Sequence, residues 1–303
     1  MNTLSAPKNI RAAIVSTGTE ILQGLYADTN AQFLAGELTR LGYEVAVIAA
    51  APDDEQAIER TFSSLFGRVD FILTTGGLGP TEDDNMRDVV ARLWGAPLEF
   101  DQRAWEMIGE RLKRRYPLVP ESNRRQAMQP RGARAIYNHY GTAPGFFLRV
   151  NDELPAILTL PGPPREMKPL WAEQAIALLL KEFPPPLMQT VVQIHTAGRG
   201  EGELNDRIKD MFGARPDVTV ALLASGGLVK VRLTLRAESK AALDHLRKEM
   251  IDEVTARLGA SDIWGYDDDT LEAVVGRLLL ARNWTVAVAE SCTGGLVNAA
   301  LTA

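Results

Sequence analysis

Short apolar runs alternate with longer stretches, in which apolar residues recur every three or four positions, through the first 183 residues. Short runs rich in β-branched residues are typical of buried strands, and the longer periodicity is typical of helices with one buried face. Strands are expected at residues 10–16, 43–50, 70–75, 146–150 and 154–160, and helices at 28–41, 52–65, 83–94, 101–115, 121–128 and 166–182. This alternation predicts a three-layer α/β domain, with helices on both faces of a mostly parallel sheet.

The triple proline at residues 184–186 is typical of a linker. After it, the pattern predicts strands at 188–196, 218–223 and 228–237 and helices at 201–212 and 239–258. That β-α-β-β-α order is typical of a small α+β domain. A helix at 271–282 and a strand at 285–289 are expected to follow. We therefore expect domains at residues 1–183, 187–265 and 268–303.

The predicted strand at 70–75 runs directly into a glycine-rich loop, Gly76-Gly77-Leu78-Gly79-Pro80-Thr81, and a helical pattern leaves that loop. A glycine loop at a helix start presents backbone N–H groups at the positive end of the helix dipole, which favours phosphate. No lysine follows the last glycine, so this is not a Walker A loop, and no G-x-G-x-x-G pattern fits.

Two carboxylates, Asp83 and Asp84, are expected in the first turn of the helix that follows the loop. Carboxylates repel phosphate unless a cation lies between them, so this pair next to an anion loop indicates a bound divalent metal such as Mg, Mn or Co. The alternative is that one of the two simply caps the helix, because Asp is favoured at that position.

The composition restricts the class of protein. Of 303 residues, 46% are hydrophobic and 24% are charged, as in ordinary soluble globular proteins. The net charge of -6 argues against a nucleic-acid partner. A single cysteine, Cys292, excludes an internal disulfide and is compatible with a reducing cytoplasm. No apolar run approaches membrane-spanning length. We expect a cytoplasmic protein with no membrane partner.

Six motifs in order give the chain a family resemblance. They are G-T-E-I-L-Q-G at 18–24, D-T-N at 28–30, G-G-L-G-P-T-E-D-D at 76–84, N-R-R-Q-A at 123–127, G-T-A-P-G-F at 141–146 and L-P-G-P-P-R-E-M at 160–167. With these motifs the sequence resembles the CinA-like (competence/damage-inducible) family from about Ile10 onward. The resemblance implies a first domain of the molybdopterin-binding, MoaB/MogA-like fold, a KH-like middle domain, and the opening of a nicotinamide-nucleotide amidohydrolase domain.

The resemblance also implies two activities. The first domain is associated with metal-dependent ADP-ribose pyrophosphatase activity, and the last domain deamidates nicotinamide mononucleotide. The stretch A-E-S-C-T-G-G at 289–295 matches the amidohydrolase signature and would make Ser291 the nucleophile. Most of that domain is absent here, so we expect no amidase activity. Met86 departs from the family pattern, which has a threonine at this position of the loop.

The leading hypothesis is therefore hydrolysis of ADP-ribose to AMP and ribose 5-phosphate by a homodimer. Asp83 and Asp84 would hold the metal, and Glu20 would be the general base or, alternatively, a surface cap. Asp28 and Asn30 would bind ribose hydroxyls or cap the next helix. The predicted substrate-binding residues are Gly18, Thr19, Asp28, Asn30, Gly76, Gly77, Gly79, Pro80, Thr81, Asn123, Gln126, Gly141, Thr142, Pro144, Gly145, Gly162 and Pro163.

Two other functions remain open. A module of the same fold could bind a nucleotide or molybdopterin without converting it, because a fold does not fix a function. Adenylylation of molybdopterin is a third possibility, which rests on analogy with the fold alone.

Overall fold

The computed structural model describes residues 9–113 and 118–302. The chain divides into two compact units, Met1–Pro186 and Leu187–Ala303, each of which is described by itself. The end of the helix expected at 101–115 lies partly outside the described residues.

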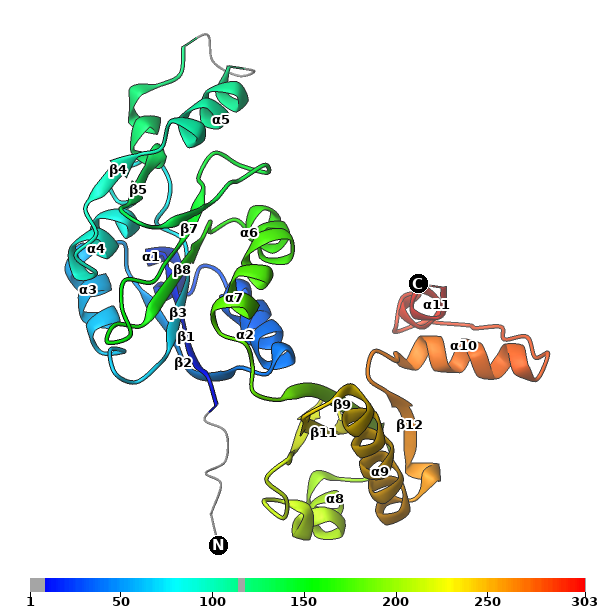
Figure 1. Cartoon of the computed structure of the whole chain (residues 1–303). Helices are drawn as coiled ribbons and strands as arrows, with labels where there is room; N and C mark the ends of the chain where they lie inside the picture. The colour runs from blue at the N-terminus through cyan, green and yellow to red at the C-terminus, as the bar shows by residue number, and fades with distance from the viewer. Residues whose placement is uncertain (1–8, 114–117, 303) are drawn as a thin grey trace, which may run out of the picture. The chain divides into compact units, whose positions relative to one another are not determined.

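The first unit is built on a six-stranded sheet with the order β2-β1-β3-β8-β7-β6 (Figure 1). Its strands are β1 (Arg11–Thr17), β2 (Glu44–Ala51), β3 (Phe71–Thr75), β6 (Arg134–Ile136), β7 (Gly145–Leu148) and β8 (Ala156–Leu160). Neighbours among β2, β1, β3 and β8 run parallel, whereas β7 is antiparallel to both β8 and β6. The prediction of a mostly parallel sheet is confirmed.

Helices cover both faces of this sheet, which confirms the three-layer α/β architecture (Figure 1). One face packs against α2 (Thr29–Leu41), α6 (Pro164–Leu170) and α7 (Ile176–Glu182). The other face packs against α3 (Glu55–Ser63) and α4 (Met86–Leu93). Because both faces are covered, the central strands are continuous apolar runs, and β3 is buried at every position. A π-helical turn, η2 (Trp171–Ala175), joins α6 to α7.

A small lobe lies beside the sheet and was only partly expected. It contains a two-stranded antiparallel ribbon of β4 (Leu98–Phe100) and β5 (Met128–Pro130), which the sequence pattern did not predict. Helix α5 (Gln102–Leu112) and the 3-10 helix η1 (Glu121–Ala127) complete the lobe around a core of its own. The short helix α1 (Thr19–Leu22), directly after β1, was also unexpected.

The second unit contains a four-stranded sheet with the order β10-β11-β9-β12, in which each neighbouring pair is antiparallel. Its elements are β9 (Met188–Thr196), α8 (Glu201–Ile208), η3 (Lys209–Met211), β10 (Val218–Ser225), β11 (Leu228–Ala237), α9 (Lys240–Leu258), η4 (Ala260–Asp262) and β12 (Ile263–Tyr266). The apolar residues of α8 and α9 pack on the same sheet face, so the predicted α+β domain is confirmed. Helices α10 (Leu271–Ala281) and α11 (Leu296–Thr302) follow.

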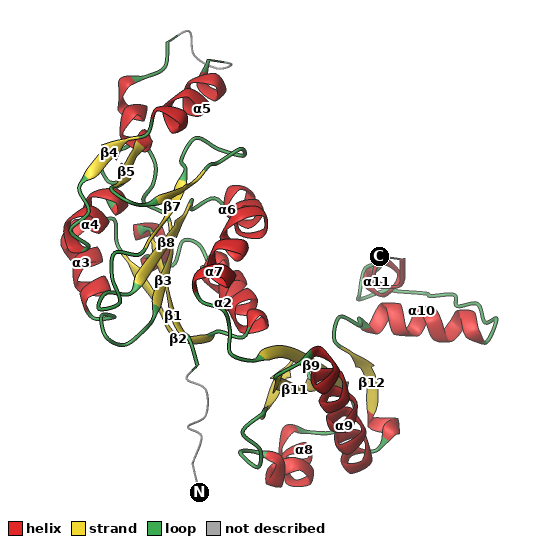
Figure 2. Ribbon diagram, viewed as in Figure 1, coloured by secondary structure: helices red, strands yellow, loops and turns green. Residues whose placement is uncertain are grey.

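Two predictions about secondary structure are wrong. Helix α4, red in Figure 2, begins only at Met86. Asp83 and Asp84 therefore lie in the loop before the helix and not in its first turn. Residues 285–289 form no strand. Val286 and Val288 there are 55% and 37% exposed, and a β-type run needs a neighbouring strand to satisfy its backbone groups.

Candidate functional site

A pocket of about 520 Å³ opens at the carboxyl ends of the parallel strands β1, β3 and β8. This is the edge at which α/β sheets bind their ligands. The pocket is lined by Thr17 from the end of β1, by the glycine loop after β3, and by the turn after β8. Among the predicted site residues, those that line it are Gly18, Glu20, Gly76, Gly77, Gly79, Pro80, Asp83, Asp84, Gln126, Thr142, Gly162 and Pro163.

Gly76 anchors the glycine loop rather than offering a free N–H group. Its N–H donates to the carbonyl oxygen of Leu160 at 3.2 Å. Its φ of +98° and a side-chain Cβ that would lie 2.4 Å from the carbonyl oxygen of Thr17 both require glycine. The N–H groups of Gly77 and Gly79, in contrast, have no acceptor among the described residues. Two of the predicted anion-binding donors are therefore available to a ligand.

Thr81 and Asp84 close a turn of their own in front of α4. The backbone N–H of Thr81 donates to Asp84 Oδ2 at 2.9 Å, and the Thr81 hydroxyl donates to the same oxygen. Thr81 therefore positions Asp84 and does not line the pocket. Hydrogen bonding to its carboxylate lowers the pKa of Asp83, so this carboxyl is ionised at neutral pH.

The donor set suits one kind of metal ion. Magnesium is typically bound by one or two carboxylates, with the remaining positions taken by water and substrate phosphates, and it does not need a full cage of protein ligands. Asp83 and Asp84, beside the free N–H groups of the loop, fit that requirement. Within the described part of the chain, no three His, Cys, Asp or Glu side chains are grouped so as to hold a metal by themselves.

The pocket is acidic. Three further carboxylates, Glu20, Asp53 and Glu166, line it together with the aspartate pair, and none of the described residues that line it is a Lys, Arg or His. Asp53 was not predicted as a site residue. Its carboxylate accepts from the N–H of Thr19 at 2.8 Å, and its own N–H donates to the Thr19 hydroxyl. Thr19 therefore fixes Asp53 at the pocket wall.

Glu166 is the second site residue that sequence reasoning missed, although it lies in one of the six motifs. It lies in the first turn of α6, on the buried side of the helix, and is only 8% exposed. Asn138 Nδ2 donates to its Oε2 at 2.8 Å. Gly141 lies directly against this carboxylate, and a Cβ at position 141 would fall 1.7 Å from Oε2. The predicted role of Gly141 thus becomes a packing role, because only glycine leaves room for Glu166.

Gln126 reaches the pocket from η1 in the small lobe. It is 1% exposed, and its Nε2 donates to the hydroxyl of Thr142 at 3.3 Å. Its Oε1 is buried without a partner among the described residues. This oxygen is enclosed by the protein, so Gln126 acts on the pocket by positioning the Thr142 hydroxyl.

Arg87 is a buried cation that joins two walls of the pocket and was also missed. Arg87 is 3% exposed, and its guanidinium donates to the carbonyl oxygens of Leu78 (2.9 Å) and Pro144 (3.1 Å). Burial lowers its pKa to about 10, so it remains charged at neutral pH. The helical periodicity of α4 marked its apolar neighbours Met86 and Val90 but gave no signal for a buried arginine.

The other predicted binding residues support the pocket from behind. Asp28 accepts from the N–H of Ala31 and so caps α2, which was the alternative to binding a ribose hydroxyl. Asn30 Nδ2 donates to the carbonyl oxygen of Gly162 at 2.6 Å and so holds the turn after β8. Three other predicted binding residues do not line the pocket and instead make contacts with neighbouring parts of the protein: Asn123, Pro144 and Gly145.

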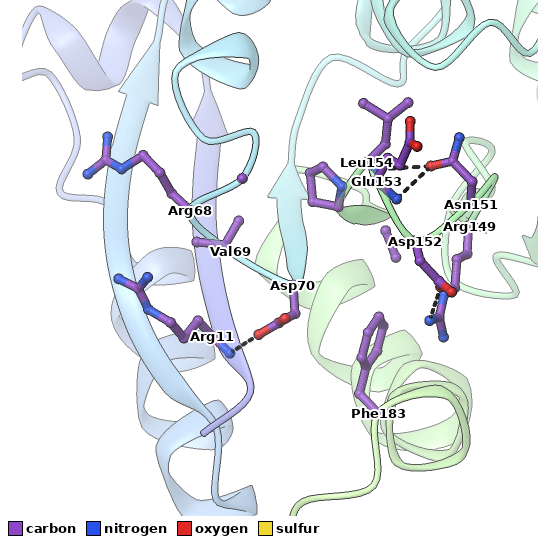
Figure 3. A pocket seen from close by; sticks show the side chains of 13 residues that line it. Arg11, Arg68, Val69, Asp70, Arg149, Asn151, Asp152, Glu153, Leu154 and Phe183 are labelled. Carbon is purple, nitrogen blue, oxygen red and sulfur yellow. Dashed lines mark hydrogen bonds and ion pairs between the residues drawn. The ribbon is translucent and has the colours of Figure 1, made fainter. Parts of the chain in front are cut away.

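A second pocket, of about 400 Å³, lies at the opposite end of the sheet (Figure 3). It is lined by three arginines, but each is engaged by the protein. Arg11 pairs with Glu44, Arg149 pairs with Asp152, and Arg68 donates to the carbonyl oxygen of Ser64. The free donors and acceptors described above are in the pocket at the carboxyl ends, which is therefore the candidate site.

Ser291 lies in an exposed loop of the second unit. None of the described residues forms a hydrogen bond with its hydroxyl. The neighbouring Glu290 instead accepts from the N–H groups of Val297 and Asn298 at the start of α11. The backbone bond from Asn298 lowers the pKa of Glu290.

Fold and site together define an α/β domain of the molybdopterin-binding class followed by a KH-type domain. Three family descriptions match successive parts of the chain: "Probable molybdopterin binding domain" at residues 13–181, "Damage-inducible protein CinA KH domain" at 193–265 and "CinA C-terminal domain" at 268–303. The chain belongs to the CinA-like family. The expected family and the expected molybdopterin-binding fold are both confirmed.

Individual relatives agree with this assignment. A competence-damage inducible protein from Clostridium beijerinckii is 36% identical over 288 residues, which cover 95% of this chain and 69% of that protein. A CinA-like protein from Thermotoga maritima is 37% identical over 289 residues, covering 95% and 68%. The crystal structure of a CinA protein of unknown function from Thermoplasma acidophilum is 31% identical, with a TM-score of 0.52, over 56% of this chain and 98% of that one.

Among the described residues, no helix combines the length and the apolar character that crossing a bilayer requires. The expected homodimer, cytoplasmic location and lack of a nucleic-acid partner stay predictions.

Proposed function

We propose that the first domain hydrolyses the pyrophosphate bond of ADP-ribose, giving AMP and ribose 5-phosphate, with a divalent metal ion as cofactor. The observation that carries the proposal is the combination of free loop N–H groups with five carboxylates in a pocket whose lining, among the described residues, contains no Lys, Arg or His. A pyrophosphate is repelled by such a wall unless a cation binds between them. The pocket volume also falls within the range of typical small-molecule sites.

Each residue has a role in this scheme. The N–H groups of Gly77 and Gly79 bind a phosphate oxygen, and Asp83 and Asp84 hold the metal ion. When bound, a divalent ion neutralises charge on the pyrophosphate and lowers the pKa of a water molecule. Glu20, exposed at the pocket rim in α1, would accept a proton from a water molecule as the water oxygen bonds one phosphorus and the bridging P–O bond to the other phosphate breaks.

The test is release of AMP from ADP-ribose by the purified chain, with and without Mg²⁺, Mn²⁺ or Co²⁺. Asp83→Asn should lower kcat/KM by about 100-fold or more, because it removes a metal ligand of a metal-assisted hydrolysis. Glu153→Gln, a carboxylate change in the opposite pocket, is the matched control and should leave the rate unchanged. AMP release that needs no metal, or that persists in Asp83→Asn, would contradict the proposal.

One observation favours a second candidate, a module that binds a nucleotide or molybdopterin without turnover. No third carboxylate, histidine or cysteine is grouped with Asp83 and Asp84 in the described part of the chain. A pure binding module should bind ADP-ribose saturably and release no AMP with any of the three metals. Its affinity should change little, or rise, in Asp83→Asn because charge repulsion falls.

A further inference from the structure

We propose that Glu166 and Thr142, the latter positioned by Gln126, form a corner of the pocket that reads sugar hydroxyl groups, and that Glu166 makes the substrate specific for a ribosyl group. The inference rests on the proposed function only in taking a phosphate at the glycine loop. All three residues line the same pocket. Gly141 lies against Glu166 and its chain neighbour Thr142 bonds Gln126, so the two side chains flank adjacent residues.

The corner contains hydrogen-bonding groups that no other described residue pairs with. Oε2 of Glu166 is occupied by Asn138, but the closest cation to Oε1 is Arg165 Nε at 3.9 Å, beyond hydrogen-bond distance. Oε1 of Gln126 is enclosed by the protein and out of reach of a ligand, so Gln126 acts on the corner by positioning Thr142. The hydroxyl of Thr142 accepts from Gln126, which leaves its own hydrogen free to donate. One unpaired acceptor, Glu166 Oε1, and one donor, the Thr142 hydroxyl, match the O–H groups of a ligand, and the carboxylate repels an anion.

The carboxylate is held rigidly, as a specificity contact must be. Asn138 Nδ2 donates both to Glu166 and to the carbonyl oxygen of Ala143, while its Oδ1 accepts from the N–H groups of Tyr140 and Gly141. Asn138 is 7% exposed, so these bonds are shielded from water. A fixed carboxylate can accept from both hydroxyls of a ribose, as acidic residues do in dinucleotide sites.

A ligand that lacks one of these hydroxyls leaves a buried acceptor unpaired. Sites built to bond a hydroxyl reject the analogue without it, whereas apolar pockets discriminate weakly. The sugar must also carry a phosphate, since the same pocket contains the free N–H groups of the glycine loop. The ligand class is therefore a ribosyl phosphate, not a deoxyribosyl phosphate or a bare phosphate ester.

The test compares binding of ribose 5-phosphate and 2-deoxyribose 5-phosphate to the full chain by titration calorimetry in Mg²⁺. The wild-type chain should prefer ribose 5-phosphate by about tenfold or more. Glu166→Gln should reduce that preference to less than about twofold, because the amide keeps the bond from Asn138 but turns N–H groups toward the ligand. Glu153→Gln should keep the full preference.

Other results would overturn the inference. They are equal binding of the two sugars by the wild-type chain, no binding of either one, or a Glu166→Gln variant that weakens both sugars equally. If Glu166→Gln does not fold, Thr142→Val removes the donor and should lower the preference at least about threefold. Because these are binding measurements, a clear preference without AMP release would reject the pyrophosphatase and keep the hydroxyl-reading corner. AMP release without a preference between the two sugars would keep the pyrophosphatase and reject the hydroxyl-reading corner.

Discussion

The guanidinium of Arg87 donates a hydrogen bond to the carbonyl oxygen of Pro144, 57 residues further along the chain, at 3.1 Å. A second bond, to the carbonyl oxygen of Leu78, ties the glycine loop to the same side chain. One buried cation thus joins two walls of the pocket that come from distant parts of the sequence.

Replacement of Arg87 should destabilise the first domain. Arg87→Met leaves two carbonyl oxygens without their donor, which should lower the free energy of unfolding by about 2–4 kcal/mol. Arg92→Met is the matched control, because Arg92 is half exposed and pairs with Glu55 on the surface; its cost should stay below about 1 kcal/mol. Urea unfolding measures both. Equal costs for the two variants would show that Arg87 contributes no more than a surface arginine.

Gly141→Ala should disturb the pocket through Glu166. The added methyl group would fall 1.7 Å from Glu166 Oε2, so the carboxylate must leave its bond with Asn138. We expect a loss of about 1–3 kcal/mol in unfolding free energy, as for overpacked cores. Gly36→Ala, in an open position of α2, should instead stabilise by up to about 1 kcal/mol. Thermal unfolding of both variants tests the contrast, and a neutral Gly141→Ala would contradict it.

Tyr43 should make the first domain sensitive to alkaline pH. Burial raises the pKa of Tyr43 to about 12, and its hydroxyl donates to the carbonyl oxygen of Phe183 at 2.8 Å. In the unfolded chain the phenol ionises near pH 10, so the full contribution to stability is present below pH 10 and is lost as pH rises toward 12. The loss should be about 2–3 kcal/mol.

Tyr43→Phe isolates this effect. It should cost about 1 kcal/mol at neutral pH, for the lost hydrogen bond, and should flatten the decline between pH 10 and 12. Denaturant unfolding across that pH range measures it. An equally steep decline in Tyr43→Phe would assign the alkaline sensitivity to other groups.

Deletion of residues 271–303 should leave the activity of the first domain intact. Helix α10 contributes no buried residue, and Leu280 and Trp284 are 79% and 66% exposed. Such an apolar surface binds hydrophobic dyes and promotes association. The shortened chain should therefore bind less dye at an unchanged rate of AMP release. A large loss of that rate on deletion would contradict the modular organisation.

The order of helices and strands could be predicted because buried positions are apolar and recur at a spacing that differs between helices and strands. Strand β3 is apolar at consecutive positions since both its faces are covered, and α2 repeats its apolar residues once per turn. Residues 285–289 have the same apolar pattern but form no strand. The pattern shows only that the residue types suit a strand, and it does not show whether a neighbouring strand is there to pair with.

The sequence by itself determined the three-layer fold, the linker and the glycine loop at a strand end, because these depend on local periodicity and turn chemistry. Only the tertiary structure decided which groups of the loop are free. It pairs the Gly76 N–H with Leu160 and Thr81 with Asp84, and it brings Glu166 and Arg87 to the site. The contacts of Gly76 and Arg87 join residues that are far apart in the chain, and such contacts exist only once the sheet and its helices have packed. The Thr81–Asp84 turn is local, but the residue pattern does not distinguish it from the first turn of a helix.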